Sequence, residues 1–303
     1  MDPKTPEIGF IGLGVMGRSL SGHLVSAGYD LRVTARSREK ARGILERGAR
    51  WVEFPAELAS QCDVVFTMVG SPCDVESLYF GAEGLLSGLR PGTLLVDMTT
   101  SSPKLAVRIS KEAKTRGGGA LDAPVSGGDR GAREATLSIM VGGEPSEFER
   151  ARPLLRLMGK TLVYQGPAGS GQHCKMCNQI AIAGGMMGVC EAMTYARHSG
   201  LNPDAVLQSL STGAAASWTL SNLAPRMLAG DFKPGFAVKH FIKDLKIALE
   251  SAEEMGLRTP GTELALRLYL QLVQNGSEEE GTQALLKIYS RIAEQGRVDV
   301  EKV

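Results

Sequence analysis

The order of apolar segments constrains the fold of this 303-residue chain more than any other feature. In the first half, short apolar runs alternate with segments whose apolar residues recur at helical spacing. Strands that alternate with helices are joined by right-handed crossovers and pair into a parallel sheet. We therefore predict an α/β domain with a doubly wound sheet. The expected strands are residues 8–11, 31–35, 64–69, 94–97, 120–122, 137–141 and 161–164, with helices at 15–27 and 37–48.

From about residue 169 the strand signals end and long helical patterns follow. Residues 171–198 are predicted to form one helix, roughly 40 Å long at about 1.5 Å per residue. We predict an N-terminal domain at 1–168 and an all-helical domain at 169–303, joined by this helix. The other expected helices are residues 203–211, 239–255, 260–275 and 282–294.

Charge and hydropathy exclude several classes of partner. Thirty-four basic residues against 33 acidic ones leave a formal charge of +1, which gives no electrostatic attraction to nucleic acid or to an anionic membrane. No apolar run reaches the roughly 18 residues of a membrane-spanning helix. The first seven residues are polar and unlike a signal peptide. We expect a cytoplasmic protein whose chain, as given, carries no organelle presequence.

The cysteines do not indicate a disulfide framework, because their number is odd and their spacing scattered. Cys174 and Cys177 form a C-x-x-C pair, but a structural zinc site needs two further ligands, and the four histidines are dispersed. We expect thiols on a helix and no metal.

A glycine motif follows the first expected strand. Its six residues are Gly12, Leu13, Gly14, Val15, Met16 and Gly17, which match G-x-G-x-x-G. Its position between a strand and a helix is typical of a Rossmann-type dinucleotide site. Gly12 permits the tight turn, Gly14 lets the backbone approach a pyrophosphate, and Gly17 lets helix and strand pack closely. The helix N-terminus offers N–H groups to the phosphates. We expect a dinucleotide cofactor here.

The end of the second strand bears on the choice of cofactor. NAD enzymes usually place a carboxylate there to bind the ribose 2′-hydroxyl. Here the strand ends at Ala35, followed by Arg36 and Ser37, and a guanidinium beside a hydroxyl suits a 2′-phosphate. Asp30 precedes the strand and should point away from the ribose. NADP is therefore favoured, with NAD left open. Two further cofactor contacts are expected at the end of the third strand, at Met68 and Val69.

The loop after the expected strand at 120–122 is rich in small residues. Ser126 can donate a hydroxyl, and Gly127 and Gly128 can expose N–H groups that no side chain covers. Several donors close together suit a carboxylate. The loop predicts a binding site for the carboxylate of a small substrate.

The start of the long helix carries a lysine and two amides on one face. Lys175, Asn178 and Gln179 are spaced i, i+3 and i+4. Beside a nicotinamide, the lysine could move the proton of a substrate hydroxyl while hydride passes to or from the ring. A lysine in such a role needs a pKa lowered towards neutrality, which burial near other positive groups gives. The candidate catalytic residues are Lys175, Asn178 and Ser126.

Four motifs, in the same order along the chain, resemble the β-hydroxyacid dehydrogenase family. They are the glycine motif at 12–17, residues 122–128 with the following 131–137, the Lys175 segment, and the sequence Lys243-Asp244-Leu245. The resemblance covers nearly the whole chain and is more specific for the family than for one member. Members include 3-hydroxyisobutyrate dehydrogenase, tartronate semialdehyde reductase and the glyoxylate/succinic semialdehyde reductases.

The resemblance implies roles for the substrate-binding residues. Lys175 matches the family's catalytic lysine. Ser126, Gly127 and Gly128 match the loop that binds the substrate carboxylate, and Asn178 matches the amide that helps to orient the substrate.

The resemblance also assigns residues around the cofactor and the pocket. Thr100 matches a threonine near the nicotinamide ribose, and Lys243 matches a lysine that contacts the cofactor. Phe236 and Asp244 match residues that close the pocket and position the lysine. Ala35 departs from the asparagine that many NADP-type members have at this position.

The implied activity is hydride transfer between NADP(H) and a small β-hydroxyacid or its semialdehyde, as in 3-hydroxyisobutyrate dehydrogenase. The alternative within this class is a glyoxylate or succinic semialdehyde reductase that works mainly in the reducing direction. Imine-reducing relatives generally lack the lysine found at Lys175, and decarboxylating 6-phosphogluconate dehydrogenase is a longer chain. The alternative of another class is a non-catalytic NADP-binding interaction module, against which Ser126, Lys175, Asn178 and Asp244 together argue.

The helical half carries more apolar faces than one small core should need. Its long helix also contains Gly184, Gly185 and Gly188, and each interior glycine costs up to about 1 kcal/mol relative to alanine. That cost is tolerable where another helix packs very closely. We therefore expect a homodimer or homotetramer built through this domain.

Overall fold

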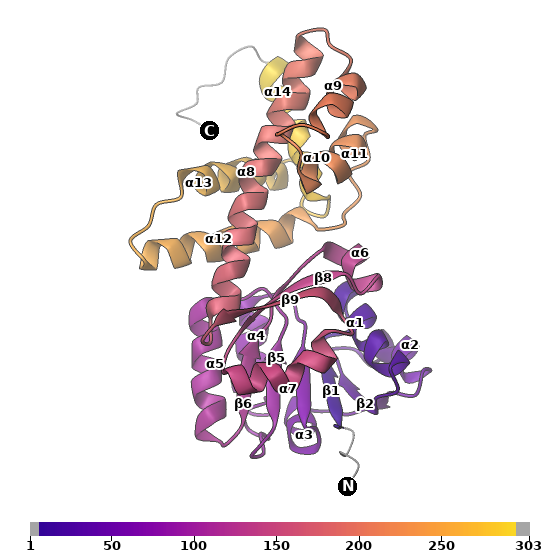
Figure 1. Ribbon diagram of the computed structural model, residues 1–303, viewed down its shortest axis with the longest axis vertical. Helices are drawn as coiled ribbons and strands as arrows, with labels where there is room; N and C mark the ends of the chain where they lie inside the picture. The colour runs from indigo at the N-terminus through magenta and orange to yellow at the C-terminus, as the bar shows by residue number, and fades with distance from the viewer. Residues whose placement is uncertain (1–5, 295–303) are drawn as a thin grey trace. The chain divides into compact units, whose positions relative to one another are not determined.

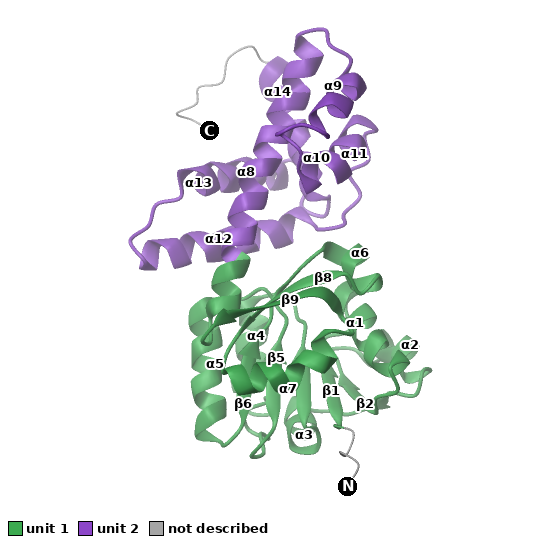
Figure 2. Cartoon of the chain, viewed as in Figure 1, with its two compact units in different colours: residues 1–175 green, residues 176–303 purple. Residues whose placement is uncertain are grey.

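The computed structural model describes residues 6–294 of the chain. Residues 1–5, at the start of the polar N-terminal segment, and 295–303, at the end of the predicted helical domain, lie outside the described residues. The chain divides into two compact units, residues 1–175 (unit 1) and 176–303 (unit 2), coloured separately in Figure 2. The division falls inside helix α8 (Ser170–His198), shortly after the predicted boundary at 168.

Unit 1 contains, within the described residues, one sheet of nine strands (Figure 1). The strands lie in the order β3-β2-β1-β4-β5-β6-β8-β7, with β9 beside β8. Their bounds are β1 Ile8–Ile11, β2 Leu31–Thr34, β3 Arg50–Trp51, β4 Val64–Thr67, β5 Leu94–Asp97, β6 Gly119–Asp122, β7 Val125–Ser126, β8 Leu137–Gly142 and β9 Gly159–Gly166.

The strands from β3 to β6 are parallel, which confirms the doubly wound fold predicted from the alternation of strands and helices. The strand order reverses at β1, which pairs with both β2 and β4, and ligands of such sheets bind at the carboxyl ends of the strands near this point. β8 is antiparallel to both β6 and β7, with Ser126 opposite Ser138. Residues 127–136 join β7 to β8, and an antiparallel pair does not need the longer crossover of a parallel pair.

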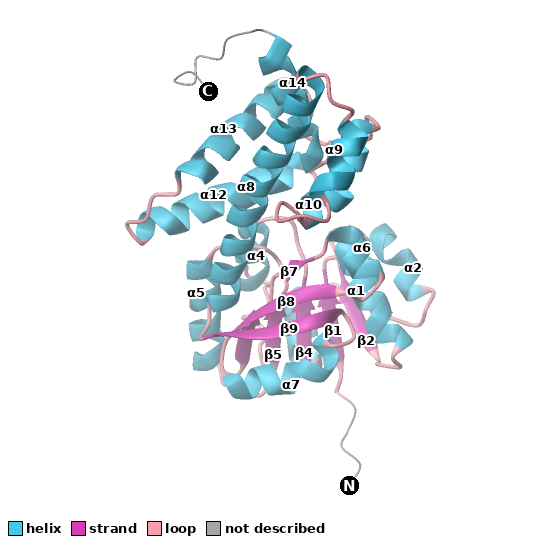
Figure 3. Ribbon diagram, turned by 45° about the horizontal axis from the view of Figure 1, so that its top comes forward, coloured by secondary structure: helices cyan, strands magenta, loops and turns pink. Residues whose placement is uncertain are grey.

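Both faces of the sheet are buried. Adjacent residues of a strand point to opposite sides, and on β4 the residues of each side pack in a different apolar cluster. Phe66 of β4 packs in one apolar cluster with Leu20, whereas its neighbour Val65 packs in a second cluster with Leu58. All four side chains are 0% exposed. Each buried side chain of this kind contributes about 1.5–3 kcal/mol. Helices flank the strands in Figure 3, which is why the central strands read as continuous apolar runs.

Four helices of unit 1 begin with a proline, whose fixed φ and missing N–H suit the first turn of a helix. The segment predicted as a helix at 37–48 is instead a short 3-10 turn, η1, followed by one α-helical turn, α2. Only Ala41 and Ile44 are buried in these two elements, too few contacts to hold a longer helix. The elements are α1 Val15–Ser26, η1 Arg38–Ala41, α2 Arg42–Leu45, α3 Pro55–Gln61, α4 Pro72–Phe80, α5 Pro103–Thr115, α6 Gly128–Arg133 and α7 Pro145–Leu155.

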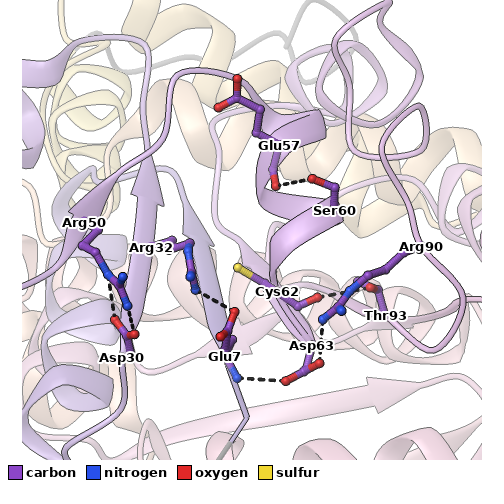
Figure 4. Close-up of polar contacts among 10 residues, drawn as sticks. All are labelled: Glu7, Asp30, Arg32, Arg50, Glu57, Ser60, Cys62, Asp63, Arg90 and Thr93. Atoms are coloured by element: carbon purple, nitrogen blue, oxygen red, sulfur yellow. Dashed lines mark hydrogen bonds and ion pairs between the residues drawn. The ribbon is translucent and has the colours of Figure 1, made fainter.

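Ion pairs join the amino ends of the first strands (Figure 4). Arg32 Nη1 lies 2.9 Å from Glu7 Oε2, and Arg50 is paired with Asp30. Asp30 precedes β2, so it lies at the opposite end of that strand from the turn after β1. This carboxylate is therefore part of the scaffold and does not face a ligand at the carboxyl ends.

Unit 2 is helical and is organised around the apolar side of α8. Met186 and Met193 of α8 share one cluster with Phe241 and Tyr269. The last two rings meet edge to face, with centroids 5.0 Å apart, and the buried Tyr269 hydroxyl donates to the carbonyl of Thr282. The remaining elements are α9 Pro203–Leu210, α10 Trp218–Asn222, α11 Ala224–Leu228, α12 Val238–Glu254, α13 Pro260–Gln274, η2 Thr282–Leu285 and α14 Leu286–Glu294.

The three interior glycines of α8 are exposed. A Cβ added at Gly184, Gly185 or Gly188 would meet no heavy atom within 4 Å. Within the described chain, therefore, nothing packs closely against these glycines. None of the described helices is long and apolar enough to span a membrane.

Candidate cofactor and catalytic site

The glycine motif forms the turn between β1 and α1. Gly12 has a φ of +95°, and a Cβ there would lie 2.1 Å from the carbonyl oxygen of Met68. At Gly17 a Cβ would lie 1.8 Å from the carbonyl oxygen of Gly12. At Gly14 it would meet no heavy atom within 4 Å. Packing thus requires Gly12 and Gly17, whereas Gly14 keeps space open beside the N-terminus of α1, as a bound pyrophosphate needs.

The other motif residues differ in what they can offer a cofactor. The Leu13 side chain is buried in the core of unit 1, so only its backbone can serve a ligand. Val15 is exposed and Met16 half-buried at the first turn of α1, where N–H groups have no carbonyl partner within the helix.

The end of β2 carries the groups predicted to bind a 2′-phosphate. Ala35 leaves no carboxylate there, and Ser37 makes no capping hydrogen bond with its hydroxyl. The Arg36 side chain is 83% exposed, and its Nη1 lies 3.7 Å from Asp74 Oδ1. The Arg36 guanidinium and the Ser37 hydroxyl therefore follow the end of β2 as neighbouring residues. The Asp74 carboxylate is close enough to compete with a 2′-phosphate for the guanidinium.

A buried polar network joins the ends of β4 and β5. Thr67 Oγ1 donates to Asp97 Oδ1 at 2.8 Å and lies 3.0 Å from the Tyr79 hydroxyl. The same Asp97 oxygen accepts the backbone N–H of Thr99 at 3.0 Å. Burial raises the pKa of Asp97 to about 6, although the hydrogen bonds from Thr99 and Thr67 act in the opposite direction. The carboxylate thus holds the first residue of the turn after β5.

This network also holds the predicted cofactor contacts of β4. The N–H of Val69 donates to Thr99 Oγ1 at 3.0 Å, and the N–H of Met68 donates to the carbonyl of Ile11 at 2.9 Å. Met68, Val69 and Thr100 are half-buried. The structure therefore brings Met68, Val69 and Thr100 to the carboxyl edge that also carries the glycine turn.

The predicted carboxylate loop comprises the last residue of β7, Gly127, and the first residue of α6. Ser126 is half-buried, whereas Gly127 and Gly128 are exposed. Their φ angles are +132° and +63°, which other residues rarely adopt. Two consecutive glycines are thus needed for the chain to pass from β7 into α6 and leave this backbone uncovered.

The carboxylate of Asp122, at the end of β6, anchors the start of α8. Its two oxygens accept the N–H groups of Gly169 and Gln172, both at 2.8 Å. Burial raises the pKa of Asp122, and these N–H groups oppose that shift. A Cβ at Gly171 would lie 2.6 Å from the Asp122 carbonyl oxygen, so the helix can approach the sheet this closely only with glycine there.

The side chain of Gln172 ties the same helical turn to the end of β5. Its Nε2 donates to the carbonyl of Thr99 at 2.7 Å, and its Oε1 accepts the N–H of Ser101 at 2.9 Å. Lys175 follows three residues later and is 6% exposed. Thr100 and Lys175 therefore belong to two segments of unit 1 that are directly hydrogen-bonded to each other.

The remaining predicted residues lie in unit 2. Asn178 Nδ2 donates to Gln179 Oε1 at 2.6 Å, and Gln179 Nε2 donates to Asp244 Oδ2 at 2.5 Å. Asp244 Oδ1 lies 2.8 Å from Lys243 Nζ, without the angles of a hydrogen bond. This chain of contacts connects the two amides of α8 with the Lys243-Asp244 pair of α12.

Phe236 precedes α12 and is 36% exposed. Its ring stacks on His240, with centroids 6.4 Å apart, and meets Phe241 edge to face. Burial and the nearby Lys243 lower the pKa of His240. Phe236 is thus a partly exposed aromatic side chain and not a core residue.

No specific role was predicted from the sequence for three residues whose side chains join the segments of the site. They are Asp122, Gln172 and Gln179, all buried. The available signal was the spacing of Gln172 and Gln179 around Lys175, which places polar side chains on a helical face that is otherwise buried.

No group of three or more His, Cys, Asp or Glu side chains in residues 6–294 could hold a metal ion. Cys174 is half-buried and Cys177 is exposed, both on α8.

Comparison with protein families gives two matches that follow one another along the chain. A model described as the NAD binding domain of 6-phosphogluconate dehydrogenase matches residues 7–166. A model described as the NAD-binding domain of NADP-dependent 3-hydroxyisobutyrate dehydrogenase matches residues 169–289.

Individual relatives match over nearly their full length. An uncharacterized oxidoreductase of Bacillus subtilis is 57% identical, over 93% of this chain and 98% of its own. The 2-hydroxy-3-oxopropionate reductase of Escherichia coli is 39% identical, over 95% of this chain and 98% of its own. The solved structure of Mycobacterium tuberculosis 3-hydroxyisobutyrate dehydrogenase with L-serine superposes with a TM-score of 0.87 at 31% identity, covering 94% of this chain and 99% of that one.

Proposed function

Because this chain belongs to the β-hydroxyacid dehydrogenase family and is a nicotinamide-dependent oxidoreductase of hydroxyacids, we propose that it transfers hydride between NADP(H) and a small β-hydroxyacid or its semialdehyde. Hydride leaves the carbon that bears the hydroxyl and passes to the nicotinamide, the chemistry that the cofactor supplies when bound. The hydroxyl proton moves to Nζ of Lys175, which must be neutral before this step.

The placement of Lys175 is the observation that carries this proposal. The lysine is buried, and its helix is anchored by Asp122 to the end of β6 and by Gln172 to the turn after β5. The carboxyl ends of parallel strands are where this class of fold binds its dinucleotide. A lysine that serves only as a surface charge would be exposed to solvent, whereas Lys175 is buried at this edge.

The substrate carboxylate is proposed to bind at the loop of Ser126, Gly127 and Gly128. The exposed backbone of the two glycines and the half-buried serine offer hydrogen-bond donors without a bulky side chain in the way. Asn178 is proposed to orient the substrate, since its amide is fixed by Gln179. Phe236 is proposed to border the pocket.

Two residues of α12 are proposed to support the reaction. Lys243 would contact the cofactor, and Asp244 would help to position Lys175. The buried Asp244 is itself held by Gln179, so its carboxylate has a fixed orientation.

NADP is proposed as the cofactor because Ala35 leaves no carboxylate at the end of β2, while Arg36 and Ser37 offer a cation and a hydroxyl. The match at residues 169–289 to a model described for an NADP-dependent enzyme supports the same choice. The space beside Gly14 fits the pyrophosphate of either nicotinamide dinucleotide.

Reduction of an aldehyde acid is the second candidate function. It is favoured by the 39% identity to a 2-hydroxy-3-oxopropionate reductase over nearly the whole chain. The same residues would serve, with Lys175 as proton donor.

The test is a screen of small 3-hydroxyacids with NADP and NAD, and of aldehyde acids with NADPH and NADH, followed by the absorbance of the reduced nicotinamide. The proposal requires turnover of at least one acid by the intact chain and its loss in Lys175→Ala. Equal turnover in that variant would remove Lys175 from the mechanism.

A further inference from the structure

Gln172 is a fully buried glutamine whose amide bonds only to backbone in the contacts described above. It donates to the carbonyl of Thr99 and accepts the N–H of Ser101, which lie on either side of Thr100. The side-chain amide thus pairs with this turn as a neighbouring strand would.

The turn of residues 99–101 is held from its other side as well. Asp97 accepts the N–H of Thr99, and the N–H of Val69 donates to the Thr99 hydroxyl. Thr99 and Ser101 are buried, while Thr100 between them is half-buried. Fixed neighbours on both sides leave Thr100 little freedom to shift.

Gln172 and Lys175 share one turn of α8. Three residues advance about 4.5 Å along a helix axis, so the helix fixes the separation of the two backbone positions. The N–H of Gln172 is itself bonded to Asp122. The Gln172 side chain therefore ties the helical turn that carries Lys175 directly to the 99–101 turn, while Asp122 ties it to β6.

We propose that Gln172 is a positioning residue for hydride transfer: it fixes the distance between Thr100, on the nicotinamide side of the site, and the amine of Lys175. This inference rests on the proposed function. It does not make Gln172 a catalytic residue, because its amide is bonded to backbone groups of the 99–101 turn.

The chemistry of the two bonds selects glutamine. Methionine has a similar length but can make neither bond. Glutamate keeps an acceptor for the N–H of Ser101 but, when ionised, places a charge against the carbonyl of Thr99. Protonated glutamic acid can donate to that carbonyl and restore the pair.

The test compares Gln172→Met with a matched control, Thr93→Val. Thr93 is buried at the amino end of β5, and its hydroxyl lies 3.1 Å from the carbonyl of Cys62 (Figure 4), so its removal also deletes a buried contact to backbone. For each variant, kcat, the affinity for NADPH, the affinity for 2′,5′-ADP, which lacks the nicotinamide, and the thermal midpoint are measured.

Positioning predicts that Gln172→Met lowers kcat by about tenfold to a hundredfold, as a misplaced reacting group does. It predicts weaker NADPH binding and unchanged 2′,5′-ADP binding, whereas Thr93→Val loses stability alone. A folded Gln172→Met with wild-type kcat, or with equal losses for both ligands, overturns the proposal.

If Gln172→Met does not fold, Gln172→Glu decides. Its kcat relative to wild type should rise as the pH falls and the carboxyl becomes protonated; a ratio independent of pH overturns the proposal.

Failure of the proposed function gives a different result. Wild-type protein would then transfer hydride with no acid tested, and the comparison of NADPH with 2′,5′-ADP would still show whether Gln172 holds the nicotinamide side of the site. A selective loss for NADPH supports that role, and equal affinities in wild type and variant overturn it.

Discussion

The carboxylate of Asp122 accepts the backbone N–H of Gln172 at 2.8 Å and so joins the end of β6 to the first turn of α8. The amide of Gln172 joins the same turn to the end of β5. Because β5 and β6 are neighbouring parallel strands, both contacts fix the helix at one edge of the sheet. These contacts, all within unit 1, hold the turn of α8 that carries Lys175 at that edge.

Replacing Lys175 with methionine should lower kcat by about a hundredfold or more, the usual loss when a general acid–base group is removed. NADPH affinity should stay within about threefold of wild type, because the glycine turn is unchanged. Stopped-flow measurement of hydride transfer and a fluorescence titration would show both. The exposed Lys160→Met serves as the control, with wild-type kcat expected. A kcat reduced equally in the two variants would contradict a specific role for Lys175.

The glycines of the motif should respond differently to alanine. Gly17→Ala places a Cβ 1.8 Å from a carbonyl oxygen, so the free energy of unfolding should fall by about 1–3 kcal/mol or more. Gly14→Ala meets open space and should keep its stability but bind NADPH at least about tenfold more weakly, since the methyl group fills the pyrophosphate space. Thermal unfolding and NADPH titration of both variants test this. Equal loss of stability would show that Gly14 is structural too.

Cofactor preference should follow the charge around Arg36. Arg36→Asp removes the cation and adds a carboxylate that repels a 2′-phosphate, so kcat/KM should shift towards NAD by about tenfold or more. Asp74→Asn removes the carboxylate 3.7 Å from Arg36 and should shift it towards NADP. Steady-state kinetics with both cofactors would measure the two ratios. Shifts of the same sign in both variants would refute this account of the 2′-phosphate site.

Asp97 should make the protein less stable as the pH rises. Its pKa is about 6 in the folded chain against an ordinary value of 3.8, so the unfolded state loses the proton first. Burial of the Asp97 carboxyl therefore costs no stability below the pKa of the unfolded state, and its full cost applies above about pH 6. At about 1.4 kcal/mol per pKa unit, Asp97→Asn should stabilise the chain by up to roughly 3 kcal/mol near neutral pH, and the gain should vanish towards about pH 4.

Denaturant unfolding across this pH range measures that difference. Asp231 gives a control of opposite sign, because its bond with Arg226 lowers its pKa. Asp231→Asn should therefore reduce stability near neutral pH. A gain for Asp97→Asn that does not depend on pH would mean that the carboxyl is not the group that titrates.

We also expect a homodimer or homotetramer, which light scattering would measure directly. The exposed Gly184, Gly185 and Gly188 leave room for a helix of a second copy to approach the backbone of α8. Gly188→Leu should therefore lower the mass in solution, whereas Gly261→Leu, at another exposed helical glycine, should not. A monomeric wild type would exclude the expected assembly.

The sequence predicted those parts of the fold that depend on local patterns. The apolar runs of β4 and β5 indicated buried parallel strands because both faces of the sheet are covered. The strands β3 and β7, with two residues each, are too short to produce a pattern. The segment at 37–48 has the composition of a longer helix, but its few buried contacts hold only the short elements η1 and α2.

The candidate site likewise has features that local sequence patterns predict and features that they do not. The glycine motif could be predicted because its turn, its close packing and its open space all arise within a few residues of Gly12. Gln172 contacts a turn more than 70 residues away, and the pKa of Asp97 depends on Thr67, which lies 30 residues before it. Such relationships exist only once the strands are ordered in the sheet, so no local pattern reveals them.

The guanidinium of Arg36 lies on the surface, apart from the buried clusters that stabilise unit 1. Substitutions at such a position usually change the free energy of unfolding by no more than about 0.5 kcal/mol. Since the proposed 2′-phosphate contact depends on this side chain, one solvent-facing substitution would be expected to alter the cofactor preference without a change in the fold.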